Sequence, residues 1–237
     1  PAELWEPTVR IDTGRWSETV LDAVDLVVPD GAVTALLREA GCGTSMAAAA
    51  LTGSPPAAPG GGETVLGRRQ WRCRAAPSGR SPLEGATAFD VESAVGEQLH
   101  ALHERYRRWS VELACAAARH PAGLLGLPPD RRSGGQIKRA ALADALPPAR
   151  RVLVACGPAA SLDTATACGV WTTLRRYADA GAAVLAITHD VPVLAAARIT
   201  GHLALMRGGR VVAAGGLADP AALDGPYPRG FFRPAGH

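Results

Sequence analysis

The chain has 237 residues, of which 47% are hydrophobic and 20% are charged, and its formal net charge is +3. These values are typical of a globular protein with a large core, and they exclude the disordered and fibrous classes. The charge is too small to indicate a nucleic-acid partner, and no apolar stretch reaches the ~18 residues that span a membrane. If the protein works at a membrane, we expect another chain to cross it.

The cysteines form no closely spaced pair and no cluster with histidine; they are Cys42, Cys73, Cys115, Cys156 and Cys168. Such an odd, scattered set is typical of a reduced protein without a disulfide framework or a zinc site. The segment 1–12 is acidic and polar, unlike a signal peptide. We therefore expect a cytoplasmic protein.

The first predicted elements form a strand, a loop and a helix. Residues 19–29 alternate in polarity and predict a half-buried strand, and residues 32–37 predict a buried one. A glycine-containing loop follows, and then the helix-forming run 46–51, which we expect to end at Gly53. This order is typical of the opening unit of a nucleotide-binding α/β fold.

The middle of the chain predicts a strand over 64–74 and two helices over 91–109 and 110–119, which would form an inserted helical subdomain. Helices and strands then alternate: a helix from 136 to 146, a strand over 151–156, a helix over 164–180, a strand over 182–188 and a hairpin over 201–216. The alternation predicts a mainly parallel sheet covered on both faces.

The loop after residues 32–37 has the position of a P-loop, whose pattern is G-x-x-x-x-G-K-[ST]. In such a loop backbone N–H groups hold phosphates, the lysine reaches the terminal phosphates and the hydroxyl holds magnesium. Here Arg38 stands for the first glycine and Thr44 for the lysine, while Gly43 and Ser45 keep the required types. Taken alone, a strand-to-helix loop of small residues explains the window equally well.

A second candidate phosphate site is Ser133-Gly134-Gly135-Gln136, which begins a basic, alanine-rich helix. A serine hydroxyl and bare glycine amides at a helix N-terminus suit an anionic phosphate. The alternative is a serine N-cap followed by a glycine turn.

These segments, taken in order, resemble the ABC ATPase family. Residues 133–136 resemble its signature motif, and residues 152–163 resemble its Walker B strand and D-loop, with Ser161, Leu162 and Asp163 kept. Residues 187–190 resemble the switch-histidine segment, and 208–215 the hairpin that follows it. The resemblance implies one ABC cassette over 1–237, a P-loop NTPase-like α/β fold with an N-terminal antiparallel β region. Residues 1–74 and 147–237 would form the core, and about 75–146 the helical subdomain.

The resemblance also implies roles for single residues. The groups that act in the chain's own site are largely replaced: Thr44 for the lysine, Cys156 for the magnesium-linked aspartate and Gly157 for the glutamate that polarises water. No glutamine of the family's Q-loop is evident near 73–77. Loss of these groups predicts a degenerate site, because phosphoryl transfer depends on positioning and charge neutralisation.

Weak binding of ATP and Mg²⁺ at this site remains an open prediction. The residues that would hold ATP are Trp16 on the adenine and Gly41, Cys42, Gly43 and Thr44 on the phosphates, with Ser45 on magnesium. His189 would sense the terminal phosphate. The alternatives are a structural surface position for Trp16 and for His189.

In this family each ATP lies between one P-loop and the opposite cassette's signature, and the groups that serve the opposite site are retained here: residues 133–136 and 161–163. The resemblance thus predicts a peripheral subunit that pairs with an intact ABC ATPase beneath a permease, with a substrate-binding protein as a further partner. Residues 95–98 (VGEQ) and 225–228 (GPYP) resemble peptide and nickel importers. Lys138, the single lysine, would face the partner's nucleotide.

Two alternatives remain open at this point. One is a soluble, non-transport ABC protein, and the other is a vestigial or regulatory pseudo-ATPase.

Overall fold

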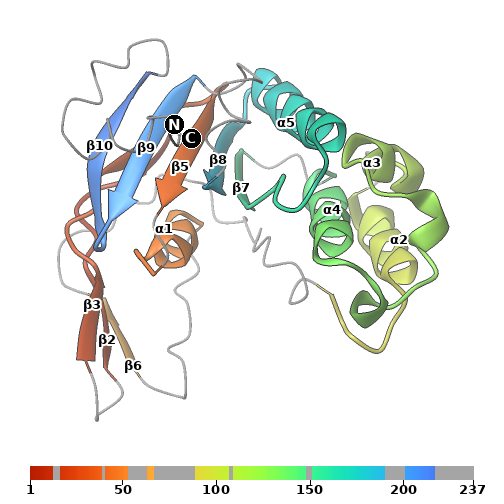
Figure 1. The fold of residues 1–237 in the computed structure, drawn as a ribbon, viewed down its shortest axis with the longest axis horizontal. Coiled ribbons are helices and arrows are strands. Elements are labelled where there is room, and N and C mark those ends of the chain that lie inside the picture. The colour runs from red at the N-terminus through yellow and green to blue at the C-terminus, as the bar shows by residue number, and fades with distance from the viewer. Residues whose placement is uncertain are drawn as a thin grey trace, which may run out of the picture.

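The computed structural model describes residues 1–12, 17–38, 41–52, 63–66, 89–106, 109–147, 151–189 and 201–216. Its centre is a five-stranded sheet in the order β10-β9-β5-β8-β7 (Figure 1). The strands are β5 (Val33–Arg38), β7 (Val152–Cys156), β8 (Ala183–Thr188), β9 (His202–Arg207) and β10 (Arg210–Gly216). All neighbours pair in parallel except β9 and β10, which form the antiparallel hairpin. The predicted mainly parallel sheet is confirmed.

The N-terminal region is antiparallel, as predicted. One pair joins β1 (Ala2–Leu4) to β4 (Leu26–Val28), and β2 (Val9–Asp12) lies between β3 (Ser17–Leu21) and β6 (Glu63–Leu66). The prediction of one continuous strand over 19–29 is wrong. The chain turns after Leu21, with Ala23 at φ 47°, and this turn lets β3 and β4 pair with different partners.

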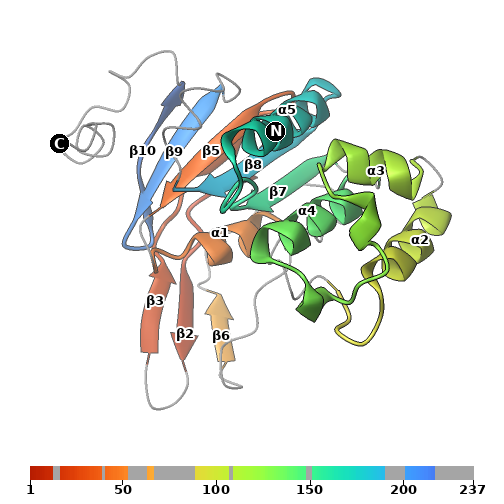
Figure 2. The same ribbon diagram turned by 45° about the vertical axis from the view of Figure 1, so that its right-hand side comes forward.

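The two faces of the sheet carry different layers (Figure 2). The helix α1 (Thr44–Leu51) shares one buried cluster with β1, β4 and the underside of the sheet. The helix α5 (Thr164–Asp179) covers the other face, where its fully buried Trp171 belongs to a second cluster.

The second cluster also includes the helical part of the chain, α2 (Val95–Tyr106), α3 (Val111–Ala117) and α4 (Gly134–Ala145). Ser110 caps α3, as its side chain accepts the Leu113 N–H. Where the sequence predicted a helix from residue 91, α2 begins only at Val95. Within the described ranges no helix has both the length and the apolarity to cross a bilayer.

The stretch 95–98, singled out as importer-like, has packing contacts of its own. A Cβ on Gly96 would lie 2.9 Å from the Leu125 carbonyl oxygen, which accepts the Gly96 N–H at 2.8 Å. The Gln98 side chain bonds both the N–H and the carbonyl of Asp90. These contacts account for the glycine and the glutamine without reference to a substrate.

Candidate functional site

The loop between β5 and α1 is shaped by two glycines with positive φ. Gly43, the residue before α1, has φ +87°, and a Cβ there would lie 2.4 Å from the Val20 carbonyl oxygen of β3. Gly41 has φ +76° but open space around it. Gly43 is therefore required by the close approach of β3, whatever the loop binds.

The N-cap of α1 is Gly43, which has no side chain that could accept the first N–H groups of the helix. Cys42 and Thr44 are buried and Ser45 is exposed. Trp16, the segment 73–77 and the segment 225–228, which also entered the sequence predictions, lie outside the described residues.

The ends of β7 and β8 meet at the same edge of the sheet as this loop. The Gly157 N–H donates to the Ile187 carbonyl at 2.7 Å, which joins the residue after β7 to β8. Cys156 is half-buried, and His189, directly after β8, is exposed. The structure therefore brings together four of the positions assigned to the chain's own site: Gly43, Cys156, Gly157 and His189, all at the carboxyl ends of parallel strands.

Lys138 of α4 reaches this edge of the chain's own sheet, and the expectation that it faces a partner's nucleotide stays a prediction. Its Nζ lies 3.3 Å from where a Cβ on Gly157 would be, and Gly157 has φ +57°. Burial of Ile137 and Ala140 on the core side of α4 leaves Lys138 on the flank of the helix that faces β7.

Magnesium does not fit the residues at this edge. Magnesium is held by oxygen ligands, commonly carboxylates, at an octahedral site. The two carboxylate positions are Cys156 and Gly157, and Ser45 offers a single hydroxyl. Throughout the described part of the chain, no three His, Cys, Asp or Glu side chains are close enough together to hold a metal ion.

The signature-like segment begins α4 as predicted. Ser133 is the N-cap, and its side chain accepts the Gln136 N–H at 3.3 Å while the Gln136 side chain accepts the Ser133 N–H at 2.9 Å. This reciprocal pair is a capping box. The local alternative raised from the sequence, a serine N-cap, is thus present in the structure.

Gly135 packs against the D-loop. A Cβ on Gly135 would lie 2.9 Å from Leu162 Cδ2 and 3.5 Å from the Ser161 carbonyl oxygen. Ser161 itself has φ 62°, an uncommon backbone conformation for serine. The two segments assigned to an opposite site therefore form one continuous surface, in which Ser133, Gly134 and Ser161 are exposed.

Asp163, the last D-loop residue, is the N-cap of α5. Its carboxylate accepts the Thr166 N–H at 2.9 Å and the Thr166 hydroxyl at 2.6 Å. These hydrogen bonds lower the pKa of Asp163. Asp163 thus has a structural role besides any role toward a partner.

A polar contact that the sequence did not predict holds the chain just before the signature-like segment. Arg132 donates to the carbonyl oxygens of Leu124 and Leu127, and to Nε2 of the buried His120 at 2.5 Å. Burial, followed by the charges of Arg132 and Arg139, lowers the pKa of His120 to about 4. His120 is therefore a neutral acceptor, and Arg132 fixes the chain that leads into Ser133.

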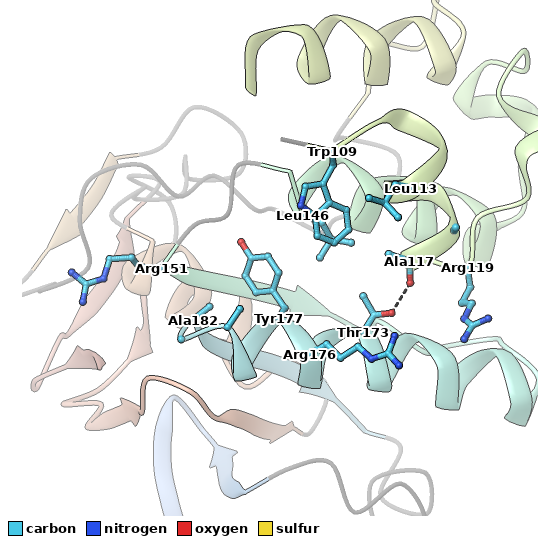
Figure 3. A pocket seen from close by; sticks show the side chains of 13 residues that line it. Trp109, Leu113, Ala117, Arg119, Leu146, Arg151, Thr173, Arg176, Tyr177 and Ala182 are labelled. Atoms are coloured by element: carbon cyan, nitrogen blue, oxygen red, sulfur yellow. Dashed lines mark hydrogen bonds between the residues drawn. The ribbon is translucent and has the colours of Figure 1, made fainter. Parts of the chain in front are cut away.

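A groove lies at the opposite edge of the sheet, near the amino ends of β7 and β8, between α3 and α5 (Figure 3). Its volume is about 830 Å³. The walls combine apolar and aromatic side chains with three exposed arginines: Trp109, Leu113, Leu146, Tyr177, Arg119, Arg151 and Arg176. The Thr173 hydroxyl donates to the Ala117 carbonyl at 2.6 Å across its base.

Comparison with solved structures places this architecture in a known fold. The chain superposes on a dimeric ATP-binding cassette, MJ0796 bound to ADP and phosphate, with a TM-score of 0.71 over 92% of this chain and 99% of that one. Sequence identity is 20%, so this likeness concerns the fold alone. The predicted ABC cassette fold is confirmed.

Comparison with curated sequences identifies the family, although no protein-family model matches the chain. The molybdenum import ATP-binding protein ModC of Thiobacillus denitrificans is 34% identical over 87% of the chain, which spans 58% of its length. The hemin import ATP-binding protein HmuV of Streptomyces coelicolor is 34% identical, and the cobalt import ATP-binding protein CbiO of Rhodobacter capsulatus is 32% identical. These two alignments cover 83% and 90% of the chain, and 72% and 79% of the relatives. With identity above 30% over most of both proteins, the chain belongs to the family of ATP-binding proteins of ABC importers.

Proposed function

We propose that the chain is a nucleotide-binding subunit whose own ATP site hydrolyses poorly or not at all, and that it completes the site of an intact ABC ATPase. Residues 133–136 would act as the signature and residues 161–163 as the D-loop toward that partner. The two subunits would lie as a heterodimer on the cytoplasmic face of a permease, with residues 1–237 as a single cassette whose helical subdomain is about 75–146.

The contact between Gly135 and the D-loop carries this proposal. Capping explains Ser133 and Asp163, but it does not require the close packing of Gly135 against Leu162 and the Ser161 carbonyl. Nor does it require a positive φ at Ser161. Strained backbone of this kind is often found at functional sites.

The chain's own site lacks the groups that ATP hydrolysis needs. Thr44 is neutral and buried, and neither Cys156 nor Gly157 offers a carboxylate. Phosphoryl transfer needs charge neutralisation around the terminal phosphate and an oriented nucleophile. His189 is exposed at the end of β8 and cannot supply both.

The permease would bind at the groove between α3 and α5. None of Arg119, Arg151 and Arg176 makes an ion pair with another residue in the described ranges, so the groove is a positively charged rim around an aromatic floor. Such a surface suits an acidic segment with an apolar anchor. Arg176→Glu should then release the chain from membranes that carry the permease.

The transported substrate is proposed from resemblance only. The segments 95–98 and 225–228 favour peptide or nickel import, with a substrate-binding protein as a further partner. The packing of Gly96 and Gln98 gives the first segment a structural explanation, so the proposal of peptide or nickel import rests mainly on the second. ATP-dependent uptake of each candidate substrate, measured with candidate permeases, would distinguish peptides and nickel from the molybdenum, hemin and cobalt of the relatives.

The test is ATP turnover by this chain alone and then mixed with the ABC ATPase encoded beside it. We expect no turnover alone and clear turnover in the mixture. Gly135→Asp should lower the turnover of the mixture by on the order of a hundredfold, because it pushes on Leu162 and adds negative charge where a phosphate would bind.

Gly123→Ala is the matched control, since a Cβ there meets nothing within 4 Å and its backbone is not left-handed. Robust magnesium-dependent turnover by the chain alone would show that Thr44, Cys156 and Gly157 are misassigned. Equal turnover with Gly135→Asp and with the control would remove the role toward a partner.

A regulatory or vestigial pseudo-ATPase is the second candidate, and the capping roles of Ser133 and Asp163 favour it. In that case the mixture would form a complex without any gain in turnover. A soluble, non-transport ABC protein would instead co-purify with ribosomes or DNA.

A further inference from the structure

The single lysine of the chain lies where the cassette has lost its charged groups. Lys138 Nζ is 3.3 Å from where a Cβ on Gly157 would lie, so a side chain there would make the ammonium group shift by a few tenths of an ångström. The nearest other atom to that position is Ala160 Cβ, at 3.5 Å. Glycine at 157 therefore leaves room for the ammonium group.

Among the residues that the structure describes, none is an anionic partner of this ammonium group. Lys138 is half-buried and forms no ion pair with any residue in the described part of the chain. The Asp163 carboxylate is already bonded to Thr166, and its charge acts on Arg139. A half-buried cation without a counter-charge favours an external anion.

The sheet places this ammonium group near the loop between β5 and α1, where the phosphates of a nucleotide would bind. β7 is separated from β5 only by β8, and Cys156 is in register with Ile187. Neighbouring strands are about 4.8 Å apart, so the ends of β7 and β5 are about 10 Å apart, within reach of a phosphate chain. The positive charge of Lys138 thus lies beside the space that a triphosphate would fill.

Charge balance is preserved by this arrangement. In an intact family site, as the resemblance gives it, the lysine and Mg²⁺ are partly offset by an aspartate and a glutamate, which leaves one positive charge for the phosphates. Here both carboxylates and the P-loop lysine are gone, and Lys138 supplies one positive charge by itself.

We propose that Lys138 replaces the metal ion in this cassette's own site, so that the polyphosphate of a nucleotide binds there without magnesium. The inference rests on the proposed function only in taking this sheet edge as the chain's own nucleotide site. It concerns binding and includes no hydrolytic step.

The experiment is calorimetric titration of the purified chain alone with ATP, in EDTA and in excess Mg²⁺. We expect the same Kd in both buffers within about twofold. Lys138→Met should raise the Kd in EDTA by about tenfold, the effect of losing a charge-assisted hydrogen bond. Tripolyphosphate should compete with ATP, and adenosine should not.

Arg131→Met is the matched control, because it removes the same charge from an exposed residue that belongs neither to this edge of the sheet nor to the groove between α3 and α5. It should leave the Kd unchanged. If Lys138→Met unfolds in a thermal melt, Lys138→Gln serves instead, since it removes the charge but retains a polar side chain, and it should also raise the Kd.

Three results would overturn the inference: no ATP binding in either buffer, binding that requires Mg²⁺, or an unchanged Kd in Lys138→Met. Competition by adenosine as strong as by ATP would also overturn it. None of these bears on the role toward a partner, which is tested by turnover of the mixture and by Gly135→Asp. A failure of one proposal is therefore distinguishable from a failure of the other.

Discussion

The loops that lead into α1 and α4 both place glycines at a helix start, but the glycines contact different things. Gly43 packs against β3 of its own core and has φ +87°, while Gly135 packs against Leu162 of the D-loop and has an ordinary helical backbone. A serine caps α4, and no side chain caps α1. A glycine at a helix start is thus explained by what it packs against: Gly43 contacts the chain's own core, whereas Gly135 contacts a loop whose Ser161 is exposed.

The largest expected effect tests whether Gly43 is structural. Gly43→Ala should lower the free energy of unfolding by about 3 kcal/mol, because it combines a left-handed backbone with a contact of 2.4 Å to the Val20 carbonyl. Gly41→Ala, at φ +76° in open space, should cost only about 1 kcal/mol. Urea unfolding of both variants measures the difference, and equal losses would mean that Gly43 has no special packing role.

The next effect concerns the signature side. The pKa of His120 falls to about 4 in the folded chain, so the unfolded chain binds a proton at higher pH than the folded one. Above pH ~6.5 the imidazole is neutral in both states, and the free energy of unfolding does not depend on this group. As the pH falls toward 4, protonation of the unfolded chain lowers the free energy of unfolding by about 2 kcal/mol, after allowance for partial solvation. Hydrogen exchange at pH 7 and pH 5 should show earlier opening of the segment before Ser133 than of α1. In His120→Gln this pH dependence should be reduced.

A smaller effect separates capping from action on a partner at Asp163. Asp163→Ser retains an N-cap for α5, whereas Asp163→Ala removes it and should lower the melting temperature by a few degrees. If the carboxylate acts on the partner's site, Asp163→Ser should lower turnover of the mixture by about tenfold with little change in melting temperature. Wild-type turnover in Asp163→Ser would assign the residue to capping alone.

The smallest effect is expected for Gly157→Glu, which should not restore ATP turnover at the chain's own site. Gly157→Glu restores the residue type of the family, but its carboxylate would meet Lys138 and pair with it, and the backbone at φ +57° resists a side chain. We expect no measurable ATP turnover by this variant alone, in a phosphate-release assay. A clear gain would show that Lys138 moves aside and that the local site is closer to activity than its sequence indicates.

Local patterns in the sequence were enough for most of the elements. The apolar runs of β5, β7 and β8 and the amphipathic α5 have periods that select strand or helix without knowledge of the fold. The start of α4 was also predictable, since Ser133 and Gln136 form a capping box from residues three apart. The replacement of the lysine and of two carboxylates could be read directly, because it is a statement about residue types.

Only the tertiary structure decided how distant segments meet. The break at Ala23, the approach of Val20 to both Gly43 and Gly209, and the anchoring of Arg132 to His120 depend on packing between segments far apart in the chain. The direction of Lys138 is the clearest case, since its sequence position did not show that its Nζ lies beside Gly157. Side-chain periodicity specifies which face of a helix is buried, but the neighbour that the exposed flank meets is set by how the layers pack.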